Sequence, residues 1–114
     1  MLAKDIETVE DEIKGFYDIN LKKYLFKGTS CLEIIKLAES LIKKIQKKNK
    51  QIKEMDYGER LNLTKNISIY ILEKVKNHNI IEENNYLIIK DIIEKLHENR
   101  ELFQFIGKKV CRCC

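Results

Sequence analysis

The stretch SCLEIIKLAESLIKKI, residues 30–45, decides the fold class of this chain. Its apolar residues recur at intervals of three and four, which places them on one face of an α-helix. They are Ile34, Ile35, Leu37, Ala38, Leu41, Ile42 and Ile45. Ser30 followed by Glu33 matches a capping box, in which the two side chains bond amides that the first helical turn leaves unpaired. We therefore expect a long amphipathic helix that starts at Ser30.

Two shorter segments precede this helix. An N-terminal amphipathic helix is predicted to end near Gly15, with one apolar face made of Leu2, Ile6, Val9, Ile13 and Phe16 or Tyr17. A second piece spans Asp18 to Lys27 and is closed by Gly28, which is free to take the left-handed conformation after a helix. Beyond Ile45 only Ile52 and Met55 continue the apolar face, so we expect the basic end of the long helix to project beyond the core.

Two more helices follow Asp56-Tyr57-Gly58, which breaks the pattern. The first has its apolar seam at Leu61, Leu63, Ile67, Tyr70, Ile71, Val75 and His78. Part of it alternates like a strand, but its length and the restored helical period favour a helix. It stops at residues 77–79. Glu82 and Glu83 begin the last helix, which is predicted to run to Gly107 along Tyr86, Ile89, Ile92, Ile93, Leu96, Phe103 and Ile106.

The fold class is therefore all-α: a small bundle of three principal helices plus an N-terminal amphipathic helix. With 114 residues, 44% apolar content and no proline, the chain suits one core and long helices. We assign residues 1–107 to a single helical domain and residues 108–114 to a basic, cysteine-rich C-terminal tail. No apolar run is long enough for a transmembrane helix, and the N-terminus does not resemble a signal peptide. We expect a location inside a cell or within a virus particle.

A lysine-rich face is the best candidate for a binding surface. It comprises Lys43, Lys44, Lys47, Lys48, Lys50 and Lys53, with no acidic residue between Glu39 and Glu54. Such a face could neutralise nucleic-acid phosphates, but no aromatic residue that could stack on bases lies between Phe26 and Tyr57. A solubilising face, or one opposed by the acidic residues of a neighbouring helix or subunit, is the favoured interpretation, with nucleic acid second.

The chain ends with three thiols in four residues, Cys111, Cys113 and Cys114. The spacing is too cramped to give three good zinc ligands easily, so no metal site is predicted; a zinc site would need the fold to bring Cys31, His78 or His97 to the tail. Lipid attachment and an interchain disulfide remain open, as does a reduced tail with no specific role. Cys113-Cys114 resembles the double-cysteine ends of Rab-type GTPases, which carry prenyl groups. The phosphate-binding motifs of those proteins are missing, so the resemblance implies only a tether to a membrane surface.

No set of residues in the sequence makes a complete catalytic site. His78 is best explained as a helix C-cap, and His97 lies far from it in the sequence. Cys31 falls in the first turn of a predicted helix and suits a small buried position. The neighbouring carboxylates Glu82 and Glu83, and likewise Glu94 and Glu98, fit solvated helix faces. We therefore expect neither an enzyme nor a cofactor.

The sequence favours a non-enzymatic helical protein that binds a protein partner or itself. Short helices with narrow apolar seams bury little surface in one chain, so association would add burial. A virion component is one form of such an assembly protein, suggested by the abundant Lys, Ile and Asn that AT-rich coding DNA produces. The alternatives are a peripheral membrane adaptor held by a lipid-modified tail and nucleic-acid binding through residues 43–53.

Overall fold

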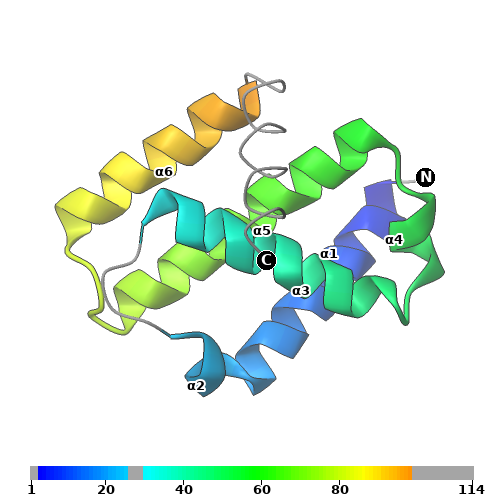
Figure 1. The fold of residues 1–114 in the computed structure, drawn as a ribbon, viewed down its shortest axis with the longest axis horizontal. Coiled ribbons are helices and arrows are strands. Elements are labelled where there is room, and N and C mark those ends of the chain that lie inside the picture. Colours follow the sequence, from blue (N-terminus) through cyan, green and yellow to red (C-terminus); the bar gives the residue numbers. More distant parts are fainter. Residues whose placement is uncertain (1–2, 26–29, 99–114) are drawn as a thin grey trace.

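The computed structural model describes the backbone of residues 3–25 and 30–98 and the side chains of residues 8–25 and 30–96. These ranges hold six helices: α1 (Ala3–Ile19), α2 (Leu21–Tyr24), α3 (Cys31–Gln46), α4 (Lys50–Glu54), α5 (Tyr57–Asn77) and α6 (Glu83–Glu98). The described ranges contain no strand, which confirms the all-α class. Helix α3 crosses over α1 and α5, and α6 runs back along α5 (Figure 1). None of the described helices is long and apolar enough to cross a membrane.

Helix α3 forms where the sequence predicts it. The Ser30 hydroxyl oxygen accepts a hydrogen bond from the Glu33 amide at 3.2 Å and so caps the first turn. The helix buries six of the predicted apolar residues, namely Ile34, Ile35, Ala38, Leu41, Ile42 and Ile45. Leu37 is partly buried against the same core. The predicted start and the predicted apolar face of this helix are therefore confirmed.

Helix α5 is the longest element, with 21 residues. It begins with a full capping box: an Asp56 carboxylate oxygen accepts from the Glu59 amide at 2.8 Å, and a Glu59 carboxylate oxygen accepts from the Asp56 amide at 3.3 Å. The sequence analysis treated this segment only as a break. At the other end His78 caps the helix and Asn79 takes a positive φ of 58°. The predicted stop at residues 77–79 is confirmed.

The prediction that the N-terminal helix ends near Gly15 is wrong. Helix α1 continues through Gly15 to Ile19, because the apolar period extends to Tyr17, whose side chain is fully buried. No atom lies within 4 Å of the place where a Cβ would stand on Gly15, so this glycine creates no special packing. In the predicted segment from Asp18 to Lys27, residues 18 and 19 belong to α1, and α2 takes up four more; Lys27 and the closing Gly28 lie outside the described residues.

The basic end of α3 does not project beyond the core. The helix ends at Gln46, and the Lys48 and Asn49 amides bond the carbonyls of residues 45 and 46 to close a turn. Helix α4 then folds back and buries Ile52 and Met55. Burying these two apolar side chains outweighs the continuation of a helix that would hold them in solvent. The prediction failed because it followed the helical period past the turn.

Helix α6 begins at Glu83, one residue from the predicted start, and packs against α5. Tyr86 and Ile93 are buried, while Ile89 packs partly buried against the core. The predicted extension to Gly107, with Phe103 and Ile106, falls outside the described residues. So does the proposed boundary between residues 107 and 108.

Candidate functional site

The outward surface of α6 carries an unusual group of exposed apolar side chains. Leu87 is 55% exposed, Ile88 58% and Ile92 40%. Asp91 and Lys95 share this surface and form an ion pair of 2.9 Å between the carboxylate and the ammonium group. We call these five residues the α6 outer face. Clustered exposed apolar side chains are typical of interaction surfaces, whereas single ones are common everywhere.

The outer face follows from runs of adjacent apolar residues in α6. Successive helical residues point about 100° apart, so the members of Ile88-Ile89 and Ile92-Ile93 cannot all face one core. The second member of each pair turns inward and the first turns outward. The predicted seam included Ile92 with Ile93, which is wrong for Ile92. The adjacent apolar pairs were the signal that could have identified this surface in the sequence.

The inner side of α6 holds the helix firmly against α5. The buried Tyr86 ring lies 4.5 Å from the Lys76 ammonium and 5.9 Å from that of Lys90, measured to the ring centroid. Lys76 also reaches a Glu83 carboxylate oxygen at 3.7 Å. Contacts of this kind contribute about 0.5–1 kcal/mol each at exposed sites. The outer face is thus presented on a packed helix.

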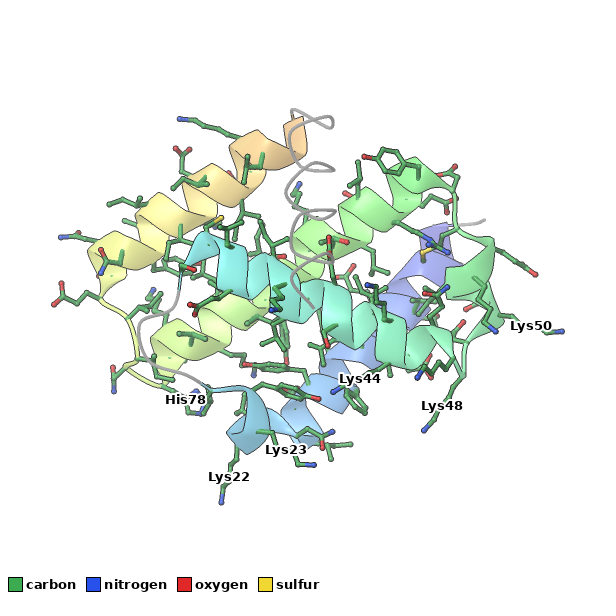
Figure 2. All side chains as sticks on the ribbon, viewed as in Figure 1. Lys22, Lys23, Lys44, Lys48, Lys50 and His78 are labelled. Atoms are coloured by element: carbon green, nitrogen blue, oxygen red, sulfur yellow. The ribbon has the colours of Figure 1, made fainter. Side chains whose placement is uncertain are left out.

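The lysine-rich face predicted from the sequence is exposed at all six positions. The fold enlarges it, because Lys44 in the last turn of α3 contacts Tyr24 in α2, and α2 adds the exposed Lys22 and Lys23. We call this set the lysine edge: Lys22, Lys23, Lys43, Lys44, Lys47, Lys48, Lys50 and Lys53. Figure 2 labels five of them: Lys22, Lys23 and Lys48 at the lower margin of the molecule, Lys50 at its right side, and Lys44 between the two lysines of α2 and those of the turn. The sequence analysis missed the two lysines of α2, since a separation of about twenty residues hides such a contact.

Three tyrosines from three helices stand behind the lysine edge. The ring of Tyr17 stacks on that of Tyr24 and meets that of Tyr70 edge-on, with centroids 5.9 Å apart in both pairs. Burial, with a smaller contribution from the charge of Asp18, raises the pKa of Tyr17 to about 12. The Tyr17 hydroxyl is buried and has no hydrogen-bond partner among the described residues. Being neutral at physiological pH, it suits packing and not proton transfer.

Cations and one carboxylate surround this aromatic cluster. The Lys44 ammonium donates to the Tyr24 hydroxyl at 2.9 Å and lies 5.1 Å from that ring centroid. The ammonium groups of Lys14 and Lys74 each lie 5.2 Å from the centroid of Tyr70. The Tyr70 hydroxyl donates to Asp18, and its pKa is raised by burial and then by this bond. These contacts tie α1, α2, α3 and α5 together at one end of the molecule.

The remaining candidates provide no catalytic geometry in the described part of the chain. Cys31 is half-buried near Ile35, and burial raises the pKa of its thiol, which lowers its reactivity. The imidazole of His78 lies 2.8 Å from the Lys74 carbonyl and caps α5, as predicted. The side chain of His97 and the tail cysteines Cys111, Cys113 and Cys114 lie outside the described side chains.

No group of three potential metal ligands occurs among the described residues. An open hollow lies at the α5–α6 connection, lined by Lys76 and by residues 79–83. Its lining joins exposed carboxylates and half-buried isoleucines without a convergent set of polar groups. The two surfaces that the structure assembles from several residues are therefore the α6 outer face and the lysine edge.

Comparison with known proteins gives no assignment. No protein-family model, curated protein or solved structure shows significant similarity to this chain. A function is therefore inferred from the α6 outer face and the lysine edge.

Proposed function

We propose that this chain is a non-enzymatic interaction or assembly protein that associates with a second copy of itself through the α6 outer face. In this proposal the body is a small bundle of three principal helices with an N-terminal amphipathic helix. The observation that carries the proposal is the joint exposure of Leu87, Ile88 and Ile92 on one helix. Water contact with these side chains costs free energy that a partner surface would recover.

The expected association is weak to moderate. Complete burial of an aliphatic side chain contributes about 1.5–3 kcal/mol, and these three side chains are about half exposed. Each would therefore contribute roughly 1 kcal/mol, and a symmetric pair of faces buries six of them. Association also loses translational and rotational freedom, which offsets much of this gain. We expect a dimer whose population rises with protein concentration.

An antiparallel, two-fold pairing of α6 fits the distribution of residues best. If Ile88 lies level with the partner's Ile92, symmetry places Ile92 level with the partner's Ile88. Lys95 then comes level with residue 85 of the partner subunit, about 3 Å along the axis from the partner's Glu83. A parallel pairing would instead bring Lys95 against the partner's Lys95. The antiparallel arrangement also opposes the two helix dipoles favourably.

Sedimentation velocity of the full chain, in reductant and over a range of concentrations, tests this function. The unsubstituted chain should shift from monomer toward dimer as concentration rises, and Ile88→Asp/Ile92→Asp should stay monomeric. Ile19→Asp is the matched control, because Ile19 is 85% exposed but lies at the end of α1. A chain that stays monomeric at every concentration, or a control that disrupts the dimer equally, contradicts the proposal. Circular dichroism should confirm that all variants remain helical.

Two predictions from the sequence stay untested proposals. A role in a virus particle would be a special case of the assembly function and is suggested by composition alone. The membrane-adaptor alternative requires a lipid on Cys111, Cys113 or Cys114. Intact mass measurement of protein from its native host should reveal an acyl or isoprenoid addition if that alternative holds, and unmodified thiols would eliminate it.

A further inference from the structure

We infer that the lysine edge is a docking surface for the phosphate backbone of nucleic acid, separate from the self-association of α6. Eight exposed lysines from α2, α3, α4 and the turn between α3 and α4 make up this surface. The proposal goes beyond the assembly function, and neither one requires the other.

The fold fixes the lysines of the turn between α3 and α4 on packed elements. Ile45 and Ile52 are buried on either side of the turn, so the backbone that carries Lys47, Lys48 and Lys50 is anchored to the core. The Asn49 side chain accepts a hydrogen bond from the Gln51 amide at 2.8 Å and caps the short helix α4. A docking surface held in this way loses less conformational freedom on binding than a flexible basic tail.

The two halves of the lysine edge are joined by a direct contact. The hydrogen bond from Lys44 to the Tyr24 hydroxyl brings the end of α3 against α2, which carries Lys22 and Lys23. The fold therefore brings together, in one strip, lysines that are about twenty residues apart in the sequence. A duplex carries one negative charge per roughly 1.7 Å of its axis, so a strip of cations can meet several phosphates together.

Lysines outnumber carboxylates in this part of the chain. At the turn the Glu12 carboxylate accepts from the Asn49 side-chain amide at 2.6 Å, and Glu39 and Glu54 border the lysine-rich segment in the sequence. Asp18 is engaged by the Tyr70 hydroxyl and lies 3.8 Å from the Lys74 ammonium. The segment from Ser40 to Lys53 itself contains no carboxylate. The field along the lysine edge is positive, which favours a polyanion.

The aromatic cluster determines which part of a nucleic acid this surface could recognise, the bases or the phosphates. The Tyr24 ring is already stacked on Tyr17 and carries the Lys44 ammonium 5.1 Å from its centroid, so it is not open to a base. Recognition would then use phosphates alone and be independent of sequence. The lack of aromatic residues in the segment 43–53 does not prevent such binding, because contact with the phosphate backbone of a nucleic acid needs no aromatic side chain.

An anionic membrane is the competing polyanion, and the apolar content of the edge disfavours it. The large exposed apolar side chains are Ile19, Leu32, Tyr57, Leu87, Ile88 and Ile92 among the described residues, and none belongs to the segment from Ser40 to Glu54. Ile19, close to α2, offers one side chain for insertion. Surface binding to a bilayer depends on a broad apolar face in addition to charge.

Fluorescence anisotropy with a labelled DNA duplex of about two helical turns tests the inference on the full chain in reductant. Affinity should fall steeply between about 50 and 200 mM salt, with a log–log slope near −4 for four to five phosphate contacts. Three variants change the net charge equally: Lys48→Glu/Lys50→Glu and Lys22→Glu/Lys23→Glu on the edge, and Lys65→Glu/Lys90→Glu, which lies outside both the lysine edge and the α6 outer face. We expect about a tenfold or greater loss for each edge variant and less than about twofold for the control.

Three results would overturn the inference. The first is no binding at about 50 mM salt, and the second is an equal loss in all three variants, which would indicate a response to net charge alone. The third is binding to vesicles containing phosphatidylserine without binding to the duplex, with Ile19→Asp abolishing it, which would assign the edge to a membrane. Failure here leaves the α6 dimer unaffected, because Ile88→Asp/Ile92→Asp tests that surface and spares every lysine.

Discussion

Helices α3 and α6 are both 16 residues long, yet they use their apolar residues in opposite ways. Six side chains of α3 are buried, and the opposite face carries mainly charge. Helix α6 buries Tyr86 and Ile93, while Leu87, Ile88 and Ile92 face solvent. The difference arises from spacing: a single stripe serves one core, whereas adjacent apolar residues divide between two surfaces. Helix α3 therefore uses its apolar residues for the core, whereas α6 leaves three of them for the self-association that we propose.

The largest expected difference comes from removing a leucine from each helix. Leu41→Ala in α3 should lower the free energy of unfolding by about 2–5 kcal/mol, because Leu41 is fully buried and leaves a cavity. Leu87→Ala in α6 should lower it by about 1 kcal/mol or less, because about half of that side chain is already in water. Urea unfolding of dilute protein, followed by circular dichroism, measures both values. Similar losses of unfolding free energy in the two variants would contradict the difference between α3 and α6 described above.

Raising the pH above 10 should lower the free energy of unfolding, because Tyr17 is buried in the core. An unfolded tyrosine loses its proton near pH 10.0, whereas Tyr17 keeps it until about pH 12. Between these values the unfolded state binds fewer protons, so the free energy of unfolding falls as pH rises. The shift corresponds to a loss of about 2–3 kcal/mol.

Tyr17→Phe provides the test of that dependence. The variant should be about as stable as the unsubstituted chain at neutral pH, because the lost hydroxyl has no partner. Its stability should fall less between pH 10 and 12 when urea unfolding is repeated at each pH. A residual fall should remain, since the pKa of Tyr70 is also raised. An unchanged alkaline profile would show that Tyr17 does not titrate as described.

A smaller effect should come from the cap of α3. Ser30→Ala removes the acceptor for the Glu33 amide and should cost about 1 kcal/mol of stability. Ser40→Ala, the same substitution inside α3, should be neutral or slightly stabilising, because alanine has the higher helix propensity. Thermal unfolding of the two variants side by side checks this. Equal midpoints would show that the Ser30 cap contributes nothing to the stability of α3.

Structure that depends on residues close together in the sequence was predicted well, whereas contacts between distant segments were not. The Ser30 cap and the buried face of α3 follow from local patterns, so they could be read directly. The turn after Gln46 depends on a core that accepts Ile52 and Met55, which no local pattern reveals. Lys22 and Lys23 join the lysine edge only because Tyr24 of α2 contacts Lys44 of α3. Ile92 was misplaced because periodicity alone does not say which member of an apolar pair the core will take.

Self-association through the α6 outer face is tested most directly by NMR dilution of the isotope-labelled chain in reductant. As concentration rises, we expect backbone amide shifts to change in α6 around residues 87–95, while the buried stretch of α3 stays constant. Concentration-independent spectra, or changes confined to α3 or to the lysine edge, would contradict the assignment of α6 as the binding helix.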